Sequence, residues 1–120
     1  MIVSCTEGGP EFDLTISRER LALITILADY PGGISWDETR KKRLRSAAMA
    51  YIGQPAAKAT KAQRDLMRAE IDLLQTGYFL LPFGNRLHIL VVTRTSFETD
   101  EVTYVALNPE LVKSVKGGGA

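Results

Sequence analysis

The feature that most constrains the fold of this chain is a change in the spacing of its apolar residues near Gly77. Before Gly77, apolar side chains recur every three or four residues, as they do along one face of a helix. After Gly77, short runs of β-branched, aromatic and leucine residues are separated by polar turns, which is typical of strands. A chain of 120 residues with this order is most simply one domain. The sequence therefore predicts an α+β fold with a three-helix core followed by an antiparallel β-hairpin.

Three helices are predicted, over residues 18–29, 35–52 and 61–75. The second and third open with the capping-box sequences Ser35-Trp36-Asp37-Glu38 and Thr60-Lys61-Ala62-Gln63, in which side chain and backbone bond reciprocally at the helix start. The third helix has two apolar rows that together cover close to half of its circumference, so we expect it to be largely buried. These rows are Ala62, Leu66, Ala69 and Leu73, and Met67, Ile71 and Leu74.

The hairpin is predicted from two strand-like runs, residues 78–83 and 87–95, with Gly84-Asn85 between them. A two-residue Gly-Asn link fits a type II′ turn, the kind that joins the strands of a tight hairpin. A further strand is expected over residues 102–107, after a solvated turn. The hairpin would follow the third helix directly.

The two ends of the chain add smaller elements to this plan. Residues 11–16 alternate polar and apolar side chains, which indicates a short strand. Asn108-Pro109-Glu110 opens a short closing helix, with proline at its first position. We therefore expect a single domain over residues 1–116 and a disordered glycine-rich tail over residues 117–120.

Charge is sorted by segment. Residues 40–68 hold nine basic residues and one acid, a net charge of +8, whereas the rest of the chain holds six bases and thirteen acids, a net charge of −7. The whole chain is therefore close to neutral, at +1. Positive charge concentrated on one stretch of a near-neutral protein favours a polyanionic partner, of which nucleic acid is the most common.

The order of elements, with a basic third helix that runs into a hairpin, resembles the winged helix-turn-helix superfamily over about residues 11–95. In that superfamily the third helix lies in the major groove of DNA, and the hairpin, or wing, contacts the DNA backbone or the minor groove. The resemblance places Lys61, Arg64 and Arg68 towards the DNA, Lys58 and Thr60 at the helix entrance and Arg86 on the wing tip. With the basic residues of the second helix, the expected nucleic-acid contacts are Arg40, Lys41, Lys42, Arg45, Lys58, Thr60, Lys61, Arg64, Arg68 and Arg86.

Two classes of function fit these features. The first is binding of duplex DNA, favoured over RNA, by a transcriptional regulator or a phage or plasmid accessory factor. The second is a protein-interaction module, an inhibitor or adaptor, that docks on an acidic partner surface. In this second hypothesis the apolar edge Phe79-Leu80-Leu81 offers a site for strand addition. The sequence leaves open whether the protein forms a homodimer.

Other classes of function have no support in the sequence. Cys5 is the only cysteine and His88 the only histidine, so we expect no intrachain disulfide and no zinc site. No nucleophile with a nearby base and no phosphate-binding loop is visible, so we expect neither an enzyme nor a cofactor. No apolar run is long enough to cross a bilayer, and the first residues do not have the pattern of a secretory signal. These observations favour a cytoplasmic protein without a membrane partner.

Overall fold

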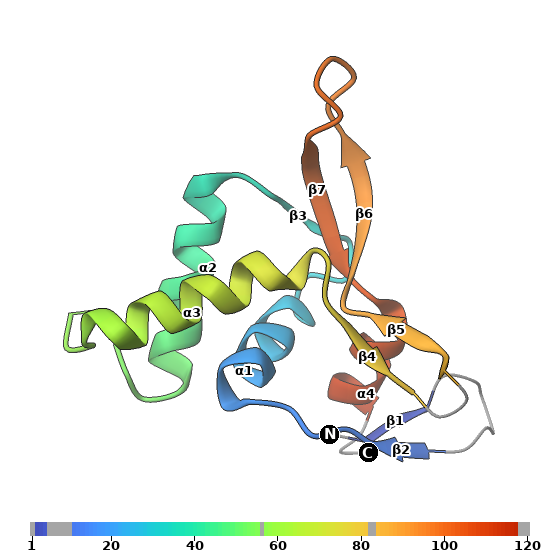
Figure 1. The fold of residues 1–120 in the computed structure, drawn as a ribbon, viewed down its shortest axis with the longest axis horizontal. Helices are drawn as coiled ribbons and strands as arrows, with labels where there is room; N and C mark the ends of the chain where they lie inside the picture. The colour runs from blue at the N-terminus through green and yellow to red at the C-terminus, as the bar shows by residue number, and fades with distance from the viewer. Residues whose placement is uncertain (1, 5–10, 56, 82–83, 118–120) are drawn as a thin grey trace.

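A computed structural model describes residues 2–4, 11–55, 57–81 and 84–117 of the chain. The helices within this part are α1 (Arg18–Leu27), α2 (Glu38–Tyr51), α3 (Lys61–Leu74) and α4 (Pro109–Gly117). The strands are β1 (Ile2–Ser4), β2 (Glu11–Asp13), β3 (Ile34–Ser35), β4 (Tyr78–Leu80), β5 (Arg86–His88), β6 (Leu90–Thr95) and β7 (Val102–Leu107). They pair antiparallel in the orders β1-β2, β3-β7-β6 and β4-β5 (Figure 1). The predicted α+β fold is confirmed.

Helix α1 lies at the centre of the molecule, where it contacts α2, α3, α4 and β7. Its residues Leu23, Ile24 and Leu27 are completely or almost completely buried. Trp36, at the start of α2, is also buried, and its indole N–H donates a hydrogen bond of 3.2 Å to the side-chain oxygen of Gln75 at the end of α3. The core therefore holds α2 and α3 side by side over α1.

The helix starts agree with the sequence in two of three cases. The hydroxyl of Ser17 accepts from the backbone N–H of Arg20, and both bonds of the capping box between Thr60 and Gln63 are present. The capping box predicted at Ser35 is wrong. Asp37 is the N-cap of α2 instead, and its carboxylate accepts from the N–H of Arg40 at 2.7 Å. Ser35 is not available for this role because it belongs to β3, which pairs with β7.

Only one of the two apolar rows of α3 is buried. Met67, Ile71 and Leu74 enter the core, whereas Leu66 and Leu73 are each about half exposed. Ala62 and Ala69, in the same row, are exposed too. The expectation that α3 is largely buried is therefore wrong. The helix packs on α1 and α2 along one side, and no described element covers the row of Ala62, Leu66, Ala69 and Leu73.

The predicted hairpin is in fact two hairpins. The expected strand over residues 87–95 breaks at Ile89, so that β5 pairs with β4 and β6 pairs with β7. Ile89 is completely buried, and its backbone N–H and carbonyl bond to Gly77 and Asn108, outside both ladders. The buried side chain and these two bonds fix the point at which the chain passes from one sheet to the other. Figure 1 shows that the β6–β7 hairpin projects from the body.

The turn predicted at Gly84-Asn85 is also wrong. The last pair of the β4–β5 ladder is Leu80 with Arg86, so five residues rather than two lie between the strands. The N–H of Leu81 donates to the carbonyl of Asn85 at 2.7 Å within this connection. The side chains of Phe79 and Leu81, on either side of the last ladder residue Leu80, are buried in the core.

The closing helix α4 begins as predicted. The side-chain oxygen of Asn108 accepts from the N–H of Glu110, and its amide donates to the carbonyl of His88. Helix α4 includes Gly117, the first residue of the predicted tail, and residues 118–120 lie outside the described part. The strand expected over residues 11–16 is shorter, as β2, and pairs with β1. None of the described helices is long and apolar enough to span a membrane.

One close approach in the fold gives a stability prediction. Gly33 has a φ of +98°, and a Cβ atom there would lie 2.8 Å from the carbonyl oxygen of Val105 and from the ring of Tyr104. We expect Gly33→Ala to lower the free energy of unfolding by about 1–3 kcal/mol, because a strained φ adds to this clash. Urea denaturation measures the change. Gly32→Ala is the matched control, since nothing lies within 4 Å of its Cβ position; equal losses in both variants would contradict the prediction.

Candidate nucleic-acid interface

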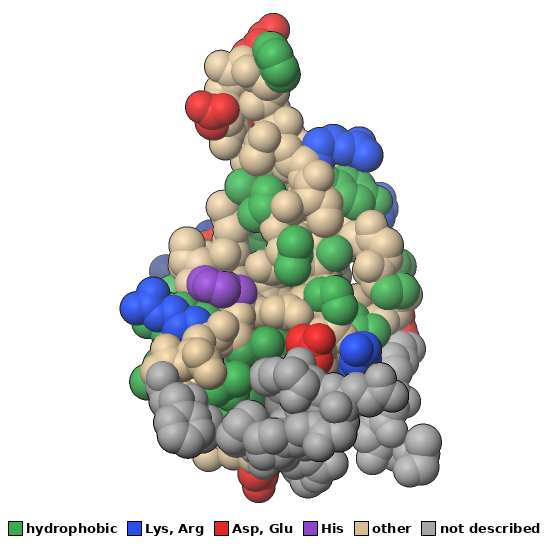
Figure 2. All heavy atoms as spheres, turned by 90° about the vertical axis from the view of Figure 1, so that its right-hand side faces the viewer, with side chains coloured by type: hydrophobic (Ala, Val, Ile, Leu, Met, Phe, Trp, Pro, Cys, Tyr) green, Lys and Arg blue, Asp and Glu red, His purple; other side chains and the backbone are tan. Residues whose placement is uncertain are grey.

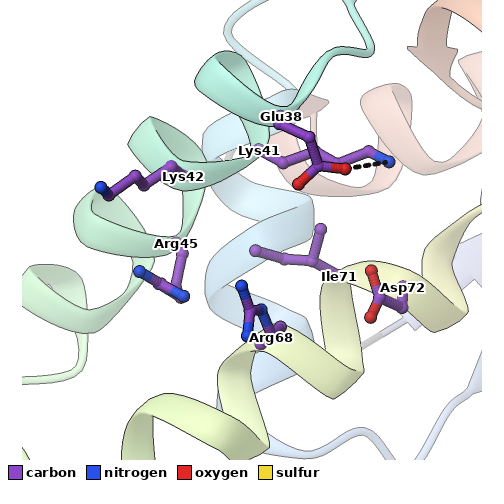
Figure 3. Close-up of a pocket in the computed structure, with 7 residues that line it drawn as sticks. All are labelled: Glu38, Lys41, Lys42, Arg45, Arg68, Ile71 and Asp72. Carbon is purple, nitrogen blue, oxygen red and sulfur yellow. Dashed lines mark ion pairs between the residues drawn. The ribbon is translucent and has the colours of Figure 1, made fainter.

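A cleft of about 220 Å³ lies between α2 and α3, and its lining is mainly basic. It is called the basic cleft below. Helix α2 contributes Glu38, Lys41, Lys42 and Arg45, and α3 contributes Arg68, Ile71 and Asp72 (Figure 3). Four cations therefore meet two carboxylates here, with Ile71 as the only purely apolar side chain. The cleft forms because Lys41 and Arg45, four residues apart, share the side of α2 that borders the buried Leu44 and Ala48.

Arg45 and Arg68 are the central pair of this cleft. Figure 3 shows their guanidinium groups pointing towards each other, one from α2 and one from α3. Neither arginine forms an ion pair or hydrogen bond with another described residue. Two guanidinium groups that face each other without a carboxylate between them favour an anion at that position. The planar fork of arginine matches the oxygens of a phosphate or of a carboxylate.

Lys41 and Glu38 close one end of the cleft. The Lys41 ammonium lies 3.8 Å from a carboxylate oxygen of Glu38 and 5.1 Å from the centroid of the Trp36 ring. Glu38 is largely exposed, so this ion pair contributes little to stability. Lys42 is exposed, and in Figure 3 its side chain extends outwards from α2. Lys42 is thus free to follow a ligand that reaches beyond the cleft.

The structure brings together four of the ten predicted contact residues: Lys41, Lys42, Arg45 and Arg68. Arg40 does not line the cleft, because it lies about 140° around α2 from Arg45 at about 100° per residue. Arg64 is half-buried, and its guanidinium donates to the carbonyl of Ala59 at 2.8 Å, which ties it to the link before α3.

Lys58, Thr60 and Lys61 are exposed at the entrance to α3. The Thr60 hydroxyl is used as the N-cap of this helix, where it accepts from the N–H of Gln63. Its predicted contact with nucleic acid therefore competes with its capping role. Lys58 and Lys61 are not among the residues that line the basic cleft, but both side chains stay open to a ligand that extends along the helix start.

Arg86 is placed away from the other predicted residues. It is the first residue of β5, beside the connection between β4 and β5, and its guanidinium carbon lies 4.7 Å from the centroid of the Tyr78 ring. In Figure 1, β5 and α2 lie on opposite sides of α1. The hairpin that projects is β6–β7, whose end carries Glu98, Asp100 and Glu101. The projecting hairpin therefore does not carry Arg86, and it ends in acids that phosphate would repel.

Three lining residues were missed in the sequence. The sequence predicts Ile71 only as a core residue and Glu38 only as a capping residue. Asp72 has no role in the predicted site. The spacing of Lys41 and Arg45 was the available indication that α2 turns a basic side towards its neighbour. Which residue of α3 faces them depends on how α2 and α3 pack together. A local sequence pattern does not predict this packing.

Among the described residues, no group of three or more His, Cys, Asp and Glu side chains is arranged to hold a metal ion. Comparisons of the chain with protein-family models, with curated proteins and with solved structures found no match.

The basic cleft yields a prediction that uses Trp36, the only tryptophan of the chain. Inorganic phosphate in the cleft should draw Lys41 away from the indole ring and change the fluorescence of Trp36. A titration at constant ionic strength measures this binding. We expect Arg45→Gln with Arg68→Gln to weaken it at least about tenfold, by ~1.4 kcal/mol. Arg43→Gln, an exposed change outside the cleft, is the control, and an equal loss there would argue against a defined phosphate site.

Proposed function

We propose that the protein binds duplex DNA and that the basic cleft between α2 and α3 holds the phosphate backbone. The observation that carries this proposal is the pair of arginines, Arg45 and Arg68, which face each other from two helices without a carboxylate between them. Lys41 and Lys42 add charge to the same cleft. Arginine matches phosphate oxygens with two parallel hydrogen bonds, and each neutralised phosphate releases condensed counterions.

The proposed contact is with the backbone, which gives affinity without sequence information. Base reading would fall to the exposed side of α3, which holds Lys61 and Arg68 but also Asp65 and Asp72. These acids weaken the attraction to DNA along that side. The cleft therefore supports the proposal better than the exposed side of α3 does. The topology of three helices and a projecting hairpin supports the winged-helix interpretation. In this proposal, however, the hairpin is not a DNA contact.

The proposal is for a binding protein with no catalytic step. Its role is that of a transcriptional regulator or of a phage or plasmid accessory factor. We place it in the cytoplasm, where a single thiol stays reduced.

A second candidate is a protein-interaction module, and one observation favours it. The row of Ala62, Leu66, Ala69 and Leu73 on α3 is exposed and apolar. Apolar residues spaced four, three and four apart form the kind of stripe on which a partner helix packs. The edge suggested earlier, Phe79-Leu80-Leu81, supports this candidate less well, because Phe79 and Leu81 are buried. Failure to bind any duplex at low salt would favour the interaction module.

The proposed function predicts how charge reversal affects DNA binding. Arg45→Glu with Arg68→Glu should weaken binding to a labelled duplex of mixed sequence at least about tenfold at low salt. It should also reduce the salt slope, log K against log salt concentration, by about two, because two phosphate contacts are lost. Fluorescence anisotropy over a salt series measures both quantities. An RNA duplex of the same sequence tests the preference for DNA.

The matched control for this experiment is Arg86→Glu with Arg94→Glu. It changes the net charge by the same amount, but both arginines lie on strands outside the basic cleft, stacked on Tyr78 and Tyr104. We expect this variant to keep the wild-type salt slope. If both double variants lose affinity to the same extent, net charge alone drives binding and the cleft is not the site.

A further inference from the structure

The end of the β6–β7 hairpin, residues 96–101, presents an aromatic side chain to solvent. Phe97 is fully exposed, the most exposed of the large apolar side chains in the described part of the chain. Figure 2 shows a hydrophobic side chain together with acidic ones at the end of the projecting hairpin. Residues 96–101 are called the hairpin tip below. An aromatic side chain that is exposed at the end of a projecting hairpin can anchor a partner surface.

The hairpin tip is an ordered turn. The N–H of Ser96 donates to the carbonyl of Glu101 at 2.7 Å, and the N–H of Asp100 donates to the carbonyl of Ser96 at 3.0 Å. Asp100 has a φ of +55°, which aspartate tolerates better than most residues. These bonds fix the backbone that carries Phe97, so less backbone entropy is lost when the tip docks.

The charge of the hairpin tip restricts its partner. Residues 95–103 hold three acids, Glu98, Asp100 and Glu101, and no base. The nearest base along β6 is Arg94, whose guanidinium carbon lies 5.1 Å from the centroid of the Tyr104 ring, on the shaft of the hairpin. An anchor of this kind is repelled by nucleic acid and by anionic membranes. It fits a basic pocket in which long side-chain stems offer apolar surface to an aromatic ring.

This chain itself contains such a pocket. In the basic cleft, the side-chain stems of Arg45 and Arg68 provide apolar surface, whereas Ile71 beneath them is buried. Their guanidinium groups, which pair with no other described residue, match the acids of the hairpin tip. In Figure 1 the hairpin extends away from the body that holds α2 and α3, so the tip is available to another molecule.

We propose that the hairpin tip of one molecule docks into the basic cleft of a second copy of this chain. Phe97 packs against the side-chain stems of Arg45 and Arg68, and Glu98 and Glu101 pair with their guanidinium groups. Each molecule has one tip and one cleft, so two molecules that exchange tips close as a dimer, whereas one-way docking extends as a chain. The contact joins one short turn to one cleft and therefore buries little surface. We expect the association to be weak and sensitive to salt.

Self-docking and DNA binding would use the same arginines. One consequence, which rests on the proposed function, is that DNA displaces the hairpin tip of the second molecule and separates the copies. The self-docking does not depend on the proposed function, because it follows from the complementarity of the tip and the cleft. The two ideas can therefore fail separately.

Sedimentation velocity of the full chain at low salt tests the self-docking. We expect the average mass to rise with protein concentration between about 10 μM and about 1 mM, a range typical of weak complexes. Phe97→Ser should weaken the association at least about tenfold, because it removes the anchor. Leu80→Ser is the control, since Leu80 is an exposed apolar residue on β4, away from the tip. A monomeric wild type over this range, or association of Phe97→Ser equal to that of the wild type, would overturn the proposal.

A charge exchange makes the test specific. Glu98→Lys with Glu101→Lys gives a basic tip, and Arg45→Glu with Arg68→Glu gives an acidic cleft. Each variant alone should be monomeric, because its tip and cleft now have the same sign of charge. Their equimolar mixture should associate, because each tip meets a cleft of opposite charge. A mixture that stays monomeric although wild type associates would overturn the proposed contact.

DNA binding by the same variants separates the two ideas. The basic-tip variant should bind duplex DNA at least as tightly as wild type, because its cleft is intact. Added duplex should also lower the average mass of wild type in sedimentation. If the charge exchange restores association but no variant binds DNA, self-docking stands and the proposed function falls. If DNA binds through the cleft but the wild type stays monomeric without DNA, the proposed function stands and self-docking falls.

Discussion

Apolar burial beneath α2 and α3 is the interaction on which the rest of the structure depends. Leu23, Ile24 and Leu27 of α1 lie under both helices, and the hydrogen bond from Trp36 to Gln75 ties the start of α2 to the end of α3. At the surface, Arg45 and Arg68 face each other and repel. The free energy of the core must exceed this repulsion, because large buried side chains contribute about 1.5–3 kcal/mol each, whereas exposed charges interact far more weakly. The core thus keeps two positive charges close together, where they can bind an anion.

The sequence predicted the elements whose cause is local. Side chains that bond to their own helix predicted the capping box at Thr60 and the start of α4 at Asn108. The α+β class followed from the change of period near Gly77. These features depend on neighbours a few residues away along the chain, which is the range over which propensity and capping act.

Predictions from the sequence failed where contacts between distant segments determine the structure. Ser35 has the pattern of an N-cap, but pairing with β7 takes it into a strand and leaves the cap to Asp37. Residues 87–95 look like one strand, but the bonds of Ile89 to Gly77 and Asn108 divide it. The same holds for the candidate site. The basic stretch was visible, yet only packing selects Arg68 over Arg64 to face Arg45, and it moves Arg86 to another side of the molecule.

The position of Ile89 also has a consequence for engineering the protein. Because the buried Ile89 alone connects β5 to β6, the link between the two hairpins is only one residue long. Any insertion there would disturb both sheets and the core. The turn around Asp100, by contrast, lies far from the packed interior, so an insertion there would change the hairpin tip but not the core. A peptide epitope or a fluorescent label grafted there would leave the helices undisturbed.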